Sequence, residues 1–195
     1  MCRICYILVY FLGVEHMRCR ILTGCCAFGL CLCTQAPPID FYKENVKIEV
    51  TGAAARVTGV YYFKNLTDVG KRVKFYYPFP VDSNHDFPDT VAIEYPFEAD
   101  SAGIYFWLSI GPSSIDSFVI YYEQGVKEPF FRYITTTTQE WKRPIKEADF
   151  TIIAPETLAI DVNYAFSEPV NIDGYRQYSI PVMDFLPEED LIISW

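Results

Sequence analysis

Hydrophobic and polar residues alternate along most of the chain after residue 37, which is the pattern of strands with one buried face. Val46, Ile48 and Val50 alternate with Lys47 and Glu49, for example. The same period of two recurs, with many Val, Ile, Tyr, Phe and Thr residues, in segments 73–77, 91–95, 104–110, 118–122, 131–135, 160–164 and 191–195. The pattern predicts about ten strands.

Short segments of turn residues separate these runs, including Thr51-Gly52, Gln124-Gly125 and Asp173-Gly174. Short connections favour antiparallel hairpins over parallel crossovers. About ten strands are too many for one flat sheet and fit two packed sheets better. The best helical candidate, residues 139–148, is interrupted by Pro144 and is predicted to be a loop. We therefore predict an all-β fold, an antiparallel two-sheet β-sandwich forming a single domain over residues 37–195.

The cysteines set the first 36 residues apart from this domain. All seven lie within the first 33 residues, at Cys2, Cys5, Cys19, Cys25, Cys26, Cys31 and Cys33. A disulfide framework would be distributed through the fold it holds together, so the domain is not a disulfide scaffold. The cysteine spacing does not favour a zinc site either.

Residues 1–36 read as a targeting segment. From Met17 onward the order of regions is that of a signal peptide: a basic start, an apolar run of 13 residues, and small residues at 34–36 before the expected cleavage site. Translation is therefore predicted to begin at Met17 rather than at Met1. Pro37, just after the expected cut, disfavours cleavage. Two alternatives are a lipobox at 22–25 with a lipid on Cys25 and an uncleaved N-terminal anchor. Each places the domain in the periplasm or at the cell surface, with membrane contact only through this segment.

The charge of the domain excludes some partners. Residues 37–195 contain 13 basic and 24 acidic side chains, a net charge of −11. Such a surface repels nucleic acids and anionic lipid headgroups. We expect neither as a partner.

One loop holds the residues that could carry metal or histidine chemistry. Asp82, Asn84, Asp86 and Asp89 alternate like the first half of a calcium loop, but Phe87 and Ile93 stand where that loop needs glycine and glutamate. A proline-flanked acidic turn is the main interpretation and a calcium site the alternative. The one histidine of the domain, His85, is predicted to be a solvated loop residue. No nucleophile elbow or phosphate-binding loop is present, so no other cofactor is expected.

Aromatic and acidic side chains leave two further hypotheses. Tyr105 and Trp107 are predicted to point outward from their strand, and Trp141 to lie in a loop, where exposed rings could stack on sugars. The same rings could instead cover a sheet. A hydrolase that uses two carboxylates is also conceivable, but sequence does not give the distance between them.

The segment 45–80 resembles the VIT domain, named after vault and inter-alpha-trypsin inhibitor heavy chain proteins, and exported bacterial proteins of unknown function that share its pattern. The resemblance rests on the strands 45–50 and 55–65 and on Phe75-Tyr76-Tyr77-Pro78-Phe79-Pro80. Segments 118–124, 133–144 and 185–191 resemble the continuation in the bacterial proteins. This implies a β-sandwich interaction module with no catalytic residues to transfer. The Asp-x-Ser-x-Ser metal motif of the domain that usually follows in the animal proteins is absent from this sequence.

The leading hypothesis is an exported, non-enzymatic β-sandwich that binds a protein partner of the cell envelope or serves a structural role there. The alternative is a carbohydrate-binding module that uses Tyr105, Trp107 and Trp141. The final strand, which ends at Trp195, is expected to be an edge where a partner docks.

Overall fold

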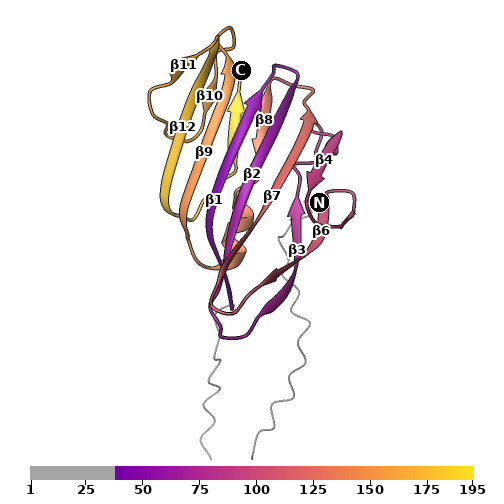
Figure 1. The fold of residues 1–195 in the computed structure, drawn as a ribbon. Helices are drawn as coiled ribbons and strands as arrows, with labels where there is room; N and C mark the ends of the chain where they lie inside the picture. Colours follow the sequence, from indigo (N-terminus) through magenta and orange to yellow (C-terminus); the bar gives the residue numbers. More distant parts are fainter. Residues whose placement is uncertain (1–37) are drawn as a thin grey trace, which may run out of the picture.

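The computed structural model describes residues 38–195, which form thirteen strands and one short 3-10 helix. The strands are β1 (Ile39–Val50), β2 (Ala54–Asn65), β3 (Lys71–Pro78), β4 (Thr90–Ile93), β5 (Phe97–Ala99), β6 (Gly103–Ile110), β7 (Ile115–Gly125), β8 (Phe130–Tyr133), β9 (Ile145–Pro155), β10 (Asp161–Val162), β11 (Val170–Ile172), β12 (Tyr175–Phe185) and β13 (Leu191–Ser194). The helix η1 spans Thr136–Trp141. The predicted all-β class is confirmed (Figure 1).

The strands form three sheets rather than the two predicted. Seven strands make the large sheet, in the order β11-β12-β9-β1-β2-β7-β4, while β10-β13-β8 and β3-β6-β5 form two three-stranded sheets. All neighbours are antiparallel except β1 and β9, which run parallel at the centre of the large sheet. A period of two identifies a strand but not its partner, so the sequence did not reveal this parallel pair.

Both small sheets pack on the same face of the large one. In the β3-β6-β5 sheet, Phe75 and Phe106 contact Phe118 of β7 at ring-centroid distances of 6.0 and 4.8 Å. In the β10-β13-β8 sheet, the ring centroid of Tyr133 of β8 lies 6.0 Å from that of Phe150 of β9. The inner faces of all three sheets therefore share one hydrophobic core.

The segment between β8 and β9 differs from the prediction. Residues 139–148 were expected to be a loop, but η1 continues to Trp141 and β9 begins at Ile145, immediately after Pro144. Lys142 follows the helix as its C-cap, with a left-handed φ of 54°. After this turn the chain enters β9, which pairs in parallel with β1.

The last strand is not an edge. β13 lies between β8 and β10, and the Trp195 indole N–H donates a hydrogen bond to the carbonyl oxygen of Gly52 at 3.2 Å. The expected docking strand is therefore covered on both sides.

No helix within residues 38–195 is long and apolar enough to cross a membrane. The predicted targeting segment, its start at Met17 and the lipidation site Cys25 lie outside the described residues.

Candidate functional site

A buried carboxyl group, Glu44 of β1, lies in the core beside a small cavity. A bulge at Tyr42 shifts the register between β1 and β2, so that Lys43 faces solvent and Glu44 lies opposite Tyr61 on the buried face. Only 2% of the Glu44 surface is exposed, and its Oε1 has no hydrogen-bond partner among residues 38–195. Burial raises the pKa of Glu44 to about 8.

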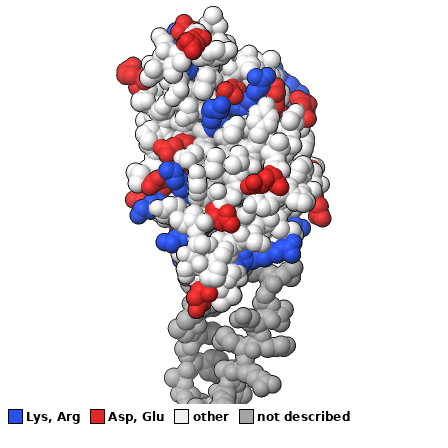
Figure 2. All heavy atoms as spheres, viewed as in Figure 1, with Lys and Arg blue, Asp and Glu red and all other residues white. Residues whose placement is uncertain are grey.

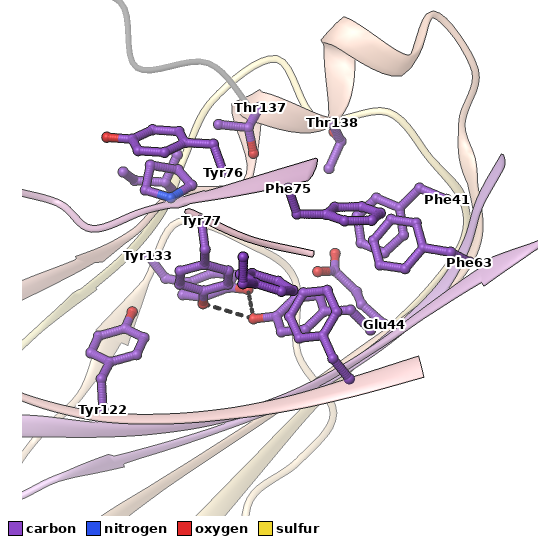
Figure 3. Close-up of a pocket in the computed structure, with 15 residues that line it drawn as sticks. Phe41, Glu44, Phe63, Phe75, Tyr76, Tyr77, Tyr122, Tyr133, Thr137 and Thr138 are labelled. Atoms are coloured by element: carbon purple, nitrogen blue, oxygen red, sulfur yellow. Dashed lines mark hydrogen bonds between the residues drawn. The ribbon is translucent and has the colours of Figure 1, made fainter. Parts of the chain in front are cut away.

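We call this space the Glu44 cavity (Figure 3). Its volume is about 30 Å³. Aromatic side chains form most of its wall, and two threonines of η1 lie at one end. The lining residues are Phe41, Glu44, Tyr61, Phe63, Phe75, Tyr76, Tyr77, Pro78, Phe106, Phe118, Tyr122, Tyr133, Ile134, Thr137 and Thr138.

Three tyrosine hydroxyls form a chain of hydrogen bonds beside Glu44. The Tyr61 oxygen lies 2.8 Å from that of Tyr77 and 2.6 Å from that of Tyr133, as the dashed lines in Figure 3 show. Burial raises the pKa of all three phenols well above the usual value. They stay protonated near neutral pH, each with a hydroxyl partner in the core.

The chemistry of the Glu44 cavity is limited by its size. A carboxyl group with a raised pKa is typical of a general acid, which is the role that the two-carboxylate hydrolase hypothesis needs. A space of about 30 Å³, however, has room for about two water molecules and not for a sugar ring. The cavity can hold water beside the protonated carboxyl group of Glu44.

The polar loop between β3 and β4 buries Asn84 and His85, whereas Asp82, Ser83, Asp86 and Asp89 are exposed. His85 is 0% exposed, which corrects the prediction that it is solvated. Its Nδ1 lies 2.8 Å from Asp82 Oδ1, and Arg132 of β8 donates a hydrogen bond of 2.8 Å to Asp82 Oδ2. Burial alone would raise the pKa of Asp82, but hydrogen bonds from His85 and from the backbone N–H groups of Asn84 and His85 lower it.

Two further members of the calcium hypothesis, Asn84 and Asp86, also have protein partners. Asn84 Oδ1 accepts hydrogen bonds from the backbone N–H groups of Lys127 and Glu128, and Asp86 forms an ion pair of 2.7 Å with Lys127. Asp89 is exposed at the end of the loop. No group of three or more His, Cys, Asp or Glu side chains within 38–195 could hold a metal ion. The calcium site stays a prediction without geometric support.

The three aromatic candidates for sugar binding separate into two locations. Trp141 is only 5% exposed and packs against Phe41 and Phe63 in the core, so its predicted exposure is wrong. It ends η1, whose buried residues are Thr137, Thr138 and Trp141. Tyr105 and Trp107 point outward from β6, as predicted, and are partly exposed.

An open hollow lies beside Trp107. Its volume is about 420 Å³, and Arg72, Tyr95, Pro96, Trp107 and Ser109 line it. We call it the Trp107 hollow. The Arg72 guanidinium carbon lies 4.9 Å from the centre of the Trp107 ring, which is a cation–π contact.

Glu44 and Arg72 were not predicted as site residues, although alternation gives the orientation of both. Glu44 stands two positions before Val46, so a period of two places it on the buried face of β1. Arg72 lies one position before the buried Val73 and therefore points outward from β3, opposite Ser109. Neither belongs to a recognised motif.

Comparison with solved structures identifies the fold. A candidate nutrient binding protein of Legionella pneumophila matches with a TM-score of 0.61 and 15% identity, over 81% of this chain and 67% of that one. The M1 zinc metallopeptidase of Deinococcus radiodurans gives a TM-score of 0.48 at 11% identity, and this chain spans 42% of it. Native yeast LTA4 hydrolase gives a TM-score of 0.44 at 11% identity, and this chain covers 29% of its length. At such identities the likeness to the Legionella protein concerns the fold alone.

No family model and no curated protein matches the sequence. The resemblance to VIT domains therefore stays a prediction.

Proposed function

We propose that residues 38–195 form a non-enzymatic protein-interaction module of an exported cell-envelope protein. The observation that carries this proposal is a row of exposed apolar side chains on the β11–β12 hairpin. Val170, Ile172 and Tyr175 are 57%, 48% and 50% exposed, respectively. Exposed apolar side chains that lie together on a free strand are typical of interaction sites.

The hairpin forms one edge of the large sheet. Among residues 38–195, β11 pairs only with β12, so within this part of the chain no strand pairs with its other side. Ile172 lies opposite Tyr175 and Val170 opposite Gln177, which places these side chains on the outer face of the sheet. An extended segment of a partner could add to β11 and cover them.

The charge around the hairpin defines the partner further. Glu156, Glu168 and Asp173 are exposed beside the apolar side chains, and Figure 2 shows acidic groups at this end of the molecule. Together with the net charge of −11 in the domain, this favours a partner segment with alternating apolar and basic residues.

The proposed location rests on the sequence pattern of residues 1–36. Fractionation of cells that produce the full chain should recover it in the envelope or the medium. Recovery in the cytoplasm alone would exclude an envelope partner.

Site-specific photocrosslinking in producing cells tests the proposed surface. A photoreactive residue at position 172 should give a discrete crosslinked product, whereas one at Val119, 45% exposed on β7, should not. The double variant Val170→Lys/Ile172→Lys places two charges on the edge and should abolish a crosslink made from position 175. Equal crosslinking from positions 119 and 172, or a product that survives the double variant, would overturn the proposal.

A further inference from the structure

The outer face of the β3-β6-β5 sheet combines cations with aromatic rings. Lys74 lies opposite Trp107, and Arg72 lies opposite Ser109 one row further along. The Lys74 Nζ is 4.8 Å from the centre of the Tyr105 ring, and the Arg72 guanidinium carbon is 4.9 Å from that of Trp107. The rings therefore hold two positive charges in fixed places on an acidic domain.

Arg72 has no counter-charge within the described part of the chain. Lys74 has Glu98 at 3.8 Å, but no carboxylate among residues 38–195 lies within ion-pair distance of Arg72. Arg72 is also the one charged member of the five residues that line the Trp107 hollow. The complementary group for the Arg72 guanidinium is an anion, although the carboxylates of Glu94 and Asp116 act electrostatically on Tyr95 of the same hollow.

The lining of the hollow specifies more than charge. Trp107 and Tyr95 provide aromatic surface, Ser109 is exposed and carries a hydroxyl, and a guanidinium can bind both oxygens of a carboxylate. A volume of about 420 Å³ is within the range of small-molecule sites and has room for one or two sugar units. Apolar ring surface, hydroxyl partners and one carboxylate receptor together match a sugar acid.

We propose that the Trp107 hollow binds a uronic-acid unit of an acidic polysaccharide. The sugar ring packs on the part of the Trp107 ring that Arg72 leaves uncovered, its carboxylate binds the Arg72 guanidinium, and a hydroxyl bonds to Ser109. A neutral sugar would leave the guanidinium without a counter-charge. This site is separate from the β11–β12 hairpin, which belongs to another sheet.

Isothermal titration of the full chain with trigalacturonate tests the site, with galactotriose as the neutral control. Saturable binding of trigalacturonate is expected, with affinity for galactotriose at least tenfold weaker. Arg72→Gln should remove that preference, and Trp107→Ala should abolish binding. Lys64→Gln, which removes an exposed cation on β2, is the matched control and should change neither.

Folding must be separated from binding. If Trp107→Ala fails to fold by circular dichroism, Trp107→Phe keeps an aromatic ring and should retain weakened binding. Equal affinities for the two sugars, binding to neither sugar, or unchanged binding in both Arg72→Gln and Trp107→Phe would overturn the proposal. Arg72-dependent binding of a poly-glutamate peptide in place of sugar would also overturn it, because the ligand would then be an acidic polypeptide.

The two proposals can be tested independently of each other. Arg72→Gln should leave the crosslink at position 172 intact, and Val170→Lys/Ile172→Lys should leave sugar binding intact. Loss of both functions in either variant would mean that the two surfaces are not separate.

Discussion

Glu44 makes the stability of the domain depend on pH. Its pKa is about 8 in the folded chain against an ordinary value of 4.5. Below pH 4.5 the carboxyl is neutral in both the folded and the unfolded state, so burial carries no ionisation cost. Between pH 4.5 and 8 the unfolded chain ionises while the folded chain keeps its proton, and stability falls as the pH rises.

We therefore expect the free energy of unfolding to decrease between pH 4.5 and 8, with a contribution from Glu44 of about 1 kcal/mol per pH unit. Glu44→Gln removes the titrating group and keeps a similar shape. The variant should be more stable than the natural chain at pH 7.5, by about 3 kcal/mol, and equal to it near pH 4. Urea unfolding at four pH values measures both effects.

Glu49→Gln is the matched control, because Glu49 lies on the same strand and faces solvent beside Lys47. It should keep the pH slope of the natural chain. An unchanged slope in Glu44→Gln would show that Glu44 does not cause the pH dependence.

Alternation predicts the facing of a strand residue well but says little about loop residues. Tyr105 and Trp107 point outward as the pattern of β6 requires. His85 and Trp141 were misplaced because their burial depends on distant segments: the His85 ring packs against Phe130 and Phe131, and Trp141 against β1 and β2. No local pattern encodes such contacts.

The amide side chain of Asn84 is one of the groups that attach the β3–β4 loop to the domain. Asn84 is 3% exposed; its Oδ1 accepts from two backbone N–H groups, and its Nδ2 donates to the Phe130 carbonyl oxygen at 2.9 Å. These bonds attach the loop to the connection between β7 and β8. Removal of the side chain would leave the part-buried Glu128 N–H and Phe130 carbonyl oxygen without these hydrogen bonds, whereas the Lys127 N–H keeps the Asn84 backbone oxygen as an acceptor.

Asn84→Ala should therefore lower the free energy of unfolding by about 1–2 kcal/mol, because hydrogen bonds to the Glu128 N–H and the Phe130 carbonyl oxygen are lost. Thermal and urea denaturation provide the measurement. Ser83→Ala, at the exposed neighbouring position, should change stability little. Similar losses in both variants would mean that the loop is not held by Asn84.

Strand positions were predictable because each strand buries one face, whereas strand partners were not. The segment 145–155 is an example. Its alternation fits a strand that runs parallel or antiparallel to its neighbour, and in the structure β9 runs parallel to β1. The short strands β5, β10 and β11, each of three residues or fewer, are too brief for a period to be recognised.

At the scale of the molecule, the three sheets share one core. Aromatic contacts join the small sheets to the large one, and Trp141 lies near their meeting point, 6.4 Å from Phe75 of β3 and 6.0 Å from Phe41 of β1. A sheet could not unfold alone without exposing the inner face of its neighbour. The domain should behave as a single cooperative unit.

We accordingly expect one unfolding transition. In the variant Trp107→Phe/Trp195→Phe, fluorescence reports Trp141 alone, and its urea transition should coincide with that of far-ultraviolet circular dichroism. Separate midpoints for the two signals would show that the region around Trp141 and the sheets unfold in different steps.

The parallel pairing of β1 with β9 also affects synthesis. Lys43 pairs with Glu147, so the first strand must wait until 104 further residues have been made before its second neighbour exists. At a translation rate of roughly 5–20 residues per second, that interval lasts about 5 to 20 seconds. Throughout it, β1 presents an open edge on the nascent chain, with Ile48 and Val50 uncovered by later segments, and must be shielded from other growing chains.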